Sequence, residues 1–508
     1  MYLIKPALYS YLFSAIGLLI IFGCFRKEIA LDIVKRLFYV MGACTLISFL
    51  SPNTIANQFF SIFVIPFFAK KQKHIAPIYI FYLLNMPALS FQINIGGIYL
   101  FDWYNYSSLT AGALIYNSVK FNKTNNNIDS SVISIAIIVL IYTIIGVRGT
   151  SFTNMIRVTV DLTCSIILPF ILIRQSINSI DDVKRFLIGL ASATASLSGL
   201  AIYEARVGWP IYTSLSSHYG LIIGGGNSVK MRGGLLRSAG PFPEPTSFAL
   251  WLALGSFVVV VSSWMFKSKF HRIIASSLCL YGMISPQSRG AILGVFTALF
   301  VFYIISAKPS QKIAGIFGCI IAACSIYIAA LSIPSVGSMF GINSIGTVSR
   351  DYRQDLFSRG IQESYNHPIV GQSVSNVMIA LSDLKQGEGI IDFVNTYLFV
   401  LLITGYFGFL LFSFSLSYPV LILLYKAHRG FESSIFISLM VSIMTMLAFT
   451  SLVGRTVTGV SIILAIMGII SSSRFKKQSL LGGKVNKRQI NLIRESIINN
   501  NHTNNTLI

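Results

Sequence analysis

Charged residues are scarce in this sequence, and their scarcity excludes an ordinary soluble protein. Only 11% of the 508 residues are charged, while 54% are hydrophobic; soluble domains carry about 25% charged residues. A chain with so apolar a surface would precipitate in water, so a lipid bilayer has to cover it. The sequence therefore predicts an all-α, polytopic helix bundle in a bacterial plasma (inner) membrane.

Motifs for binding metals or nucleotides are also missing. The six cysteines form no Cys-x-x-Cys pair and fall inside or at the ends of apolar runs, which is typical of small core residues. The chain has no His-Glu-x-x-His, no Gly-Lys-Ser/Thr phosphate loop and no Asp-x-Asp in a loop. These absences argue against a metal-dependent nucleotide-sugar transferase and an ATP-driven pump. We expect no metal and no cofactor.

Long apolar runs recur along the chain, and a spanning helix needs about 20 mostly apolar residues. We expect about twelve to fifteen transmembrane helices. The candidates are 7–24, 37–50, 55–69, 75–90, 97–118, 131–147, 157–173, 186–204, 246–263, 273–285, 290–306, 313–331, 405–425, 433–452 and 457–472.

Basic residues outnumber acidic ones by 39 to 17, and their distribution favours a membrane topology over nucleic-acid binding. If the loops alternate sides from residues 25–36 onward, most Lys and Arg residues fall in one set of loops and in the C-terminal tail. Cytoplasmic loops are enriched in Lys and Arg. This set is therefore predicted to be cytoplasmic with the C-terminus, and an odd number of spans would put the N-terminus outside.

Two segments are too long for simple turns and are predicted to be external loops. The expected organisation is transmembrane helices in 1–204, an external loop at 205–245, transmembrane helices in 246–331, a large external loop at 332–404, transmembrane helices in 405–472, and a disordered basic and Asn-rich cytoplasmic tail at 473–508.

Four arginines of the predicted external side are candidate binding residues. Arg237 and Arg289 lie just before or at the start of spans, Arg353 lies in the large loop, and Arg455 lies between the last two spans. Helix N-termini offer partial positive charge and free N–H groups. Arginine binds phosphate oxygens through paired hydrogen bonds. The four arginines and the helix N-termini together predict an outward-facing site that binds an anion. A single Arg at a span end, however, is more often an interfacial anchor.

Few acid–base groups accompany these arginines. Glu244 follows Arg237 by seven residues, and Asp392 lies near the end of the large loop. Each carboxylate could act as a catalytic base, but a carboxylate beside arginines is more often a charge partner.

Several segments between about 230 and 425 resemble, in order, the O-antigen ligase/polymerase superfamily. They are RSAGPFP (from Arg237), SRGA (Ser288 to Ala291), YRQDLFSRGIQESYNHPIVGQS (with Arg353, Leu356, Pro368 and Gly371) and VNTYLFVLLITGYFG (with Asn395, Tyr397, Leu398, Gly405 and Gly408). Ligases of this family commonly have His directly before the Asn; here that position is Val394, which favours the Wzy-type polymerases.

The resemblance implies a glycosyltransferase that joins polyprenyl-pyrophosphate-linked oligosaccharide repeat units on the outer face of the plasma membrane. The reaction would invert the configuration at the anomeric carbon. Arg237, Arg289, Arg353, Glu244 and Asp392 would be catalytic, and Asn395, Tyr397 and Arg455 would bind substrate. The resemblance also implies a partner protein, a copolymerase that determines chain length. Membrane lipid is a further expected partner, and nucleic acid is not expected. An O-antigen ligase and a polysaccharide flippase or transporter are the alternatives, although no repeat relates the two halves as in many transporters.

Overall fold

The computed structural model describes residues 2–121, 128–221, 230–232, 234–306, 309–332, 337, 344–385, 391–425, 430–452 and 454–472. The predicted tail at 473–508 lies outside these residues. Within them the chain is mostly helical, which confirms the all-α membrane bundle.

Seven helical segments of the described chain are long and apolar enough to cross a membrane. They are α1 (Ile4–Cys24), α2–η1–α3 (Lys27–Leu50), α7 (Ser130–Val147), α8–η3–α9 (Phe152–Ser176), α10 (Ile180–Val207), α14 (Arg289–Ser306) and α19 (Thr396–Tyr425). Four shorter apolar helices are α4 (Thr54–Phe68), α12 (Pro245–Val261), α20 (Phe431–Leu447) and α21 (Arg455–Ser471). The expected twelve to fifteen spans included shorter runs such as these.

The remaining elements complete the bundle and its connections. The helices are α5 (Ile75–Asn85), α6 (Asn105–Phe121), α11 (Thr213–Tyr219), α13 (Lys269–Ile284), α15 (Pro309–Ser332), α17 (Ser344–Ser364) and α18 (Val374–Ala380). Short turns are η2 (Gln72–His74), η4 (Ser263–Met265) and η5 (Ser382–Leu384). The strands are β1 (Ser90–Ile95), β2 (Ile98–Tyr104), β3 (Met231–Arg232) and β4 (Leu235–Leu236).

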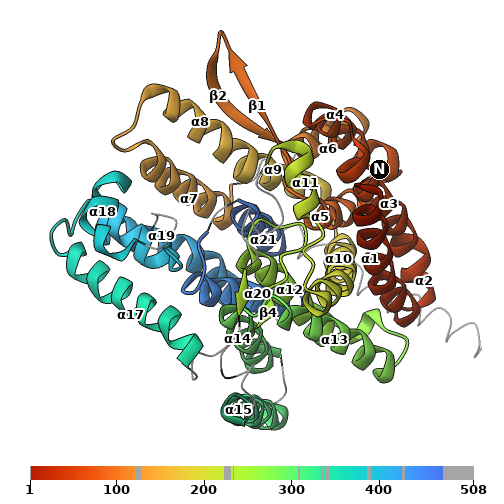
Figure 1. Cartoon of the computed structure of the whole chain (residues 1–508). Helices are drawn as coiled ribbons and strands as arrows, with labels where there is room; N and C mark the ends of the chain where they lie inside the picture. The colour runs from red at the N-terminus through yellow and green to blue at the C-terminus, as the bar shows by residue number, and fades with distance from the viewer. Residues whose placement is uncertain are drawn as a thin grey trace, which may run out of the picture.

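Helices α10, α12, α20 and α21 lie in the middle of the bundle, with α15 and the β1–β2 hairpin at opposite edges (Figure 1). Small residues let the helices approach closely. An added Cβ at Gly17 of α1 would lie 2.0 Å from the carbonyl oxygen of Ala195, and one at Gly199 of α10 would lie 2.3 Å from that of Phe13. The α1–α10 contact therefore depends on glycine in both helices.

The predicted span at 97–118 is wrong in its first part. Residues Ile98–Tyr104 form strand β2, which pairs antiparallel with β1, and the helix begins only at Asn105. Gly96 and Gly97 both have positive φ and make the tight hairpin turn. A helix through this segment would have carried Asp102 into lipid at considerable cost.

Helix α19 is broken at Gly405, where φ is 68° and ψ is −174°. The break coincides with the start of the predicted span at 405–425. The segment that follows α17 fills the break: the N–H of Tyr406 donates to the carbonyl of Pro368 at 2.7 Å, and that of Gln372 donates to Leu402 at 3.1 Å. The large loop is thereby fastened to a membrane helix through backbone hydrogen bonds.

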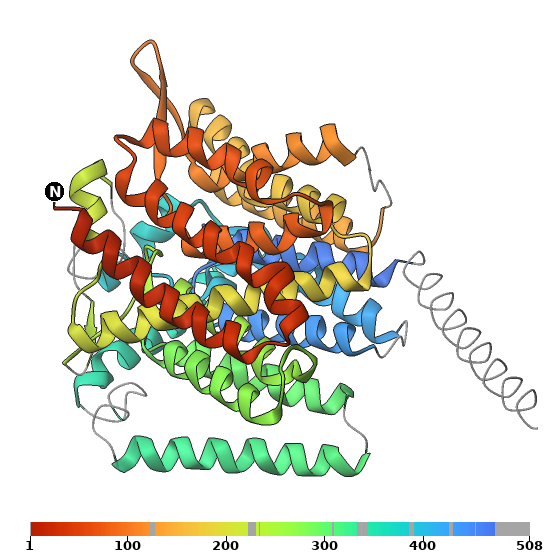
Figure 2. The same cartoon turned by 90° about the vertical axis from the view of Figure 1, so that its right-hand side faces the viewer.

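Helices α12, α14, α19 and α21 begin at one end of the bundle, as the alternating topology requires. Arg237 contacts the turn before α14, Arg455 contacts the segment before α12, and Thr396 of α19 contacts Thr450 before α21. The N-terminus lies at this end too, because the Tyr2 hydroxyl is 3.2 Å from Nδ1 of His218. Helix α21 runs away from this end toward the opposite one (Figure 2).

Candidate functional site

A short hairpin before α12 places two arginines against the turn that precedes α14. Strands β3 and β4 pair through Arg232 and Leu235. Nη1 of Arg232 donates to the carbonyl of Gln287 at 2.8 Å, and Nε of Arg237 donates to that of Pro286 at 3.1 Å. A guanidinium has five N–H donors, so each arginine is oriented by one donor and retains others for a ligand.

The turn at 285–288 has an unusual backbone. Gln287 has a φ of 53°, and no other non-glycine residue in the described ranges has a positive φ. Such conformations cost of order 1–3 kcal/mol for residues other than glycine and cluster at functional sites. Here the conformation presents two successive carbonyls, of Pro286 and Gln287, to the two arginines.

Four guanidinium groups share one electrostatic environment at this end of the bundle. Burial lowers the pKa of Arg237 to about 10, and the charges of Arg232, Arg353 and Arg289 contribute to the decrease. Burial also lowers the pKa of Arg232, with a further decrease from the charge of Arg353. Hairpin, α14 and α17 thus contribute to a single basic cluster, defined here as Arg232, Arg237, Arg289 and Arg353.

Asp392 lies beside this cluster. Burial lowers the pKa of Arg353, and the charge of Asp392 acts in the opposite direction. The backbone N–H of Asp392 donates to the hydroxyl of Tyr352 at 3.1 Å. This hydrogen bond holds the segment before α19 against α17, so that the carboxylate and Arg353 lie in the same region.

Glu244 has a direct charge partner. Its Oε2 accepts from Nζ of Lys230 at 2.8 Å, and both side chains remain partly exposed. Its charge also acts on the pKa of Arg237, opposing the decrease. Glu244 is therefore at the edge of the basic cluster, and its role as a base remains a prediction.

Asn395 and Tyr397 make hydrogen bonds that shape α19. Oδ1 of Asn395 accepts from the N–H groups of Tyr397 and Leu398 and caps the start of the helix. The Tyr397 hydroxyl donates to the carbonyl of Met444 in α20 at 2.9 Å. Their predicted contact with substrate is not tested by these interactions, which are with the protein itself.

Arg455 lies apart from the basic cluster. It is 5% exposed, and its guanidinium lies over the ring of Phe242 at 4.7 Å. Nη2 donates to the carbonyl of Pro241 at 3.3 Å. Tyr82 and Tyr106 of the N-terminal half and Tyr212 of the loop after α10 also interact electrostatically with Arg455. Through Phe242 and Pro241, Arg455 contacts the loop before α12.

Glu204 was missed by sequence reasoning, although it fixes the same loop. This carboxylate is completely buried at the end of α10. It accepts from Oγ of Ser238 at 2.7 Å, from the N–H of Gly240 at 2.9 Å and from that of Ile211 at 3.1 Å. A signal was present: an acidic residue in the last turn of an apolar helix opposes the helix dipole.

Lys230 and Arg232 were also missed. The run KMRGGLLR contains a Gly-Gly turn between short apolar stretches, which is a hairpin signal. Recognising it would have placed Arg232 beside Arg237 before the structure was known.

The arrangement suits a ligand with several anionic oxygens. Guanidinium groups that are held close together repel one another, which disfavours their charged forms. A negatively charged oxygen bound between them removes this repulsion. Within the described part of the chain, no group of three His, Cys, Asp or Glu side chains is placed to hold a metal ion.

Fold and site together define a multi-pass α-helical membrane protein with a basic cluster at one end of the bundle. No protein-family model matches the chain, and no curated protein matches it either.

Proposed function

We propose that this protein is a polysaccharide polymerase that joins polyprenyl-pyrophosphate-linked oligosaccharide repeat units on the outer face of a bacterial plasma membrane. The observation that carries the proposal is that Arg232 and Arg237 bind carbonyls of the turn just before Arg289, with Arg353 close enough for its charge to act on both, at one end of a membrane bundle. A diphosphate attached to a membrane lipid would reach such a cluster from the bilayer surface.

The proposed reaction uses the arginines to stabilise a leaving group. A hydroxyl oxygen of one unit attacks the anomeric carbon of another, and the bond from that carbon to the diphosphate oxygen breaks with inversion. The diphosphate leaves with the electron pair, and preorganised guanidinium groups offset its charge. Asp392 and Glu244, whose charges reach the cluster, are the candidates for accepting the hydroxyl proton.

The distribution of basic residues supports an outward orientation. Lys267, Lys269, Arg272 and Lys312 lie at the ends of α12 to α15 that are remote from Arg289. Because Lys and Arg accumulate on the cytoplasmic side, the basic cluster would face the periplasm or cell exterior.

The test is complementation of a polymerase-deficient strain, read as the ladder of glycan lengths on a gel. Arg237→Ala, Arg289→Ala and Arg353→Ala should each lower polymer formation by roughly 100-fold or more, as loss of a charge-stabilising donor does elsewhere. The protein should remain in the membrane at normal amounts.

Arg359→Ala is the matched control. Arg359 lies on α17 with Arg353, but it is half exposed and pairs with Asp383, so its loss should leave the ladder intact. A normal ladder with both Arg237→Ala and Arg353→Ala would refute the site. Long chains that form without this protein but stay on the carrier would indicate a ligase.

A further inference from the structure

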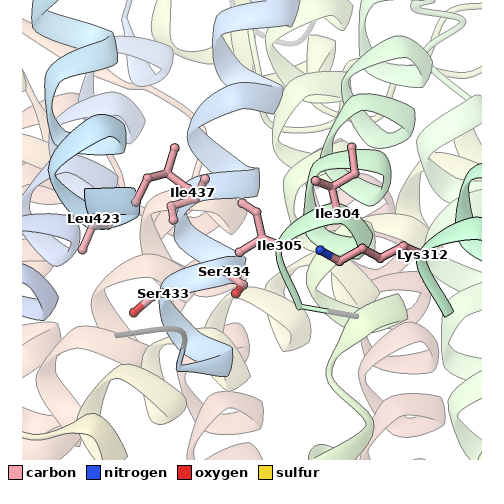
Figure 3. Close-up of a pocket in the computed structure, with 8 residues that line it drawn as sticks. Ile304, Ile305, Lys312, Leu423, Ser433, Ser434 and Ile437 are labelled. Carbon is pink, nitrogen blue, oxygen red and sulfur yellow. The ribbon is translucent and has the colours of Figure 1, made fainter. Parts of the chain in front are cut away.

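Two grooves flank the last turn of α14, at the opposite end of the bundle from the basic cluster. The first has a cavity volume of about 210 Å³ and lies between α14, α15, α19 and α20. Its walls are isoleucine and leucine side chains, including Ile304, Leu423 and Ile437 (Figure 3).

One end of this first groove is polar. Ser433 and Ser434 belong to the first turn of α20, and the residue that precedes the helix, Gly430, supplies no side-chain cap. The first N–H groups of a helix lack helical acceptors and favour anions. The ammonium group of Lys312 points into the groove from α15 (Figure 3).

The positive charge of Lys312 is not cancelled by the nearest acidic residue on α20. Glu432 lies in the same first turn, but its carboxylate is 3.7 Å from Nζ of Lys184 on α10. Lys312 forms no ion pair with any residue in the described ranges. The groove thus combines apolar walls with a cation, two hydroxyls and a helix N-terminus.

The second groove repeats this chemistry on the other side of α14. It has a cavity volume of about 440 Å³ and lies between α12, α13 and α14. Arg272 provides the cation, Ser276 and Ser277 provide adjacent hydroxyls, and Val260 and Phe302 belong to the apolar wall. Two independent sets of residues therefore each combine apolar walls with a cation and two adjacent hydroxyls near the last turn of α14.

We propose that these two grooves bind anionic phospholipid, with the phosphate at Lys312 or Arg272 and an acyl chain along the apolar wall. In a membrane protein, apolar walls at the bundle surface are covered by acyl chains, and basic pockets between helices select anionic head groups. A soluble anion would use only the polar end and leave the larger apolar part uncovered. The inference does not depend on the proposed glycan chemistry.

Native mass spectrometry of the purified full chain tests this proposal. Phosphatidylglycerol should be retained in preference to phosphatidylcholine with the same acyl chains. Lys312→Gln and Arg272→Gln should each lower phosphatidylglycerol retention at their groove by about fivefold, the effect expected for one basic residue near an anionic membrane surface. Ile304→Trp, which narrows the first groove without changing charge, should lower retention of both lipids.

Lys269→Gln is the matched control, because Lys269 is exposed on α13 one turn before Arg272 and does not line either groove. It should leave lipid retention unchanged. Equal retention of the two lipids, or an equal loss with Lys269→Gln, would overturn the proposal. Displacement of the lipid by millimolar inorganic phosphate alone would overturn it as well, since the anion would then come from the aqueous phase.

Discussion

Glu204 fastens the loop that carries Arg237 to the end of α10. Its two carboxylate oxygens accept from a serine hydroxyl and two backbone N–H groups, which come from the loop after α10 and from the loop before α12. A buried acceptor that satisfies three donors is expensive to replace, because each donor left unpaired costs about 1–3 kcal/mol.

Replacing Glu204 by Gln should therefore lower both stability and anion binding. The amide NH2 would face donors that now meet an oxygen, which shifts Ser238 and Gly240 and with them Arg237. We expect a loss of about 1–3 kcal/mol in the free energy of unfolding and weaker stabilisation by pyrophosphate, both measured by thermal unfolding of the purified protein.

The control for this change is Glu363→Gln, in the large loop. Glu363 accepts from Asn366 and Gln372 but does not contact the loop with Arg237. If Glu204→Gln bound pyrophosphate as the parent does, the positioning role of Glu204 would be wrong.

Residue type and position were enough to find part of the site. Arg237, Arg289 and Arg353 stood out because they lie near the predicted outward N-termini of spans or in the large loop, and in the structure the charges of Arg289 and Arg353 act on Arg237. Arg455 was grouped with them on its helix position, but its guanidinium is buried against the ring of Phe242. Sequence position gives the end of a helix; it does not give the direction in which a side chain packs.

The break in α19 is the element on which the large loop depends. A Cβ added at Gly405 would lie 2.4 Å from the backbone carbonyl of Ile369, and one at Gly371 would lie 2.5 Å from that of Ile403. Nη1 of Arg148 adds hydrogen bonds to the carbonyls of Val370 and Ile403, at 2.7 and 3.1 Å. Backbone therefore packs directly on backbone, with positive φ at both glycines.

Gly405→Ala should destabilise the protein by about 2 kcal/mol or more, because a positive φ with ψ near 180° costs other residues of order 1–3 kcal/mol and the new methyl group collides with the loop. Thermal unfolding measures the effect. Gly23→Ala is the control: a Cβ there meets no atom within 4 Å, so the change should be neutral or slightly stabilising. Equal melting temperatures for the two variants would contradict this account of the break.

The elements differ in how well the sequence predicted them. Long apolar runs located the helices, but the span predicted at 405–425 began too late, because α19 already starts at Thr396 and Gly405 is only a break within it. The β1–β2 hairpin was missed because Ile98–Tyr104 is apolar and aromatic enough to pass for part of a span. The paired glycines, Gly96 and Gly97, and the charge of Asp102 distinguish it from a membrane helix.

The whole molecule has two chemically different ends, and labelling tests the orientation that we propose. Introduced cysteines at Ser217 and Lys269 are suitable because both residues are exposed and lie at opposite ends. In intact cells a membrane-impermeant maleimide should label Ser217→Cys and should label Lys269→Cys only after permeabilisation. The reverse pattern would place the basic cluster in the cytoplasm and end the polymerase proposal.

The backbone hydrogen bonds at Pro368 and Tyr406 join the segment after α17 to the membrane helix α19. An excised fragment spanning 344–395 would leave the N–H of Gln372 and the carbonyl of Pro368 without the partners that α19 supplies, and α19 alone would expose an open backbone inside lipid. We therefore expect neither piece to fold on its own, and biochemical work on the segment 344–395 requires the intact chain.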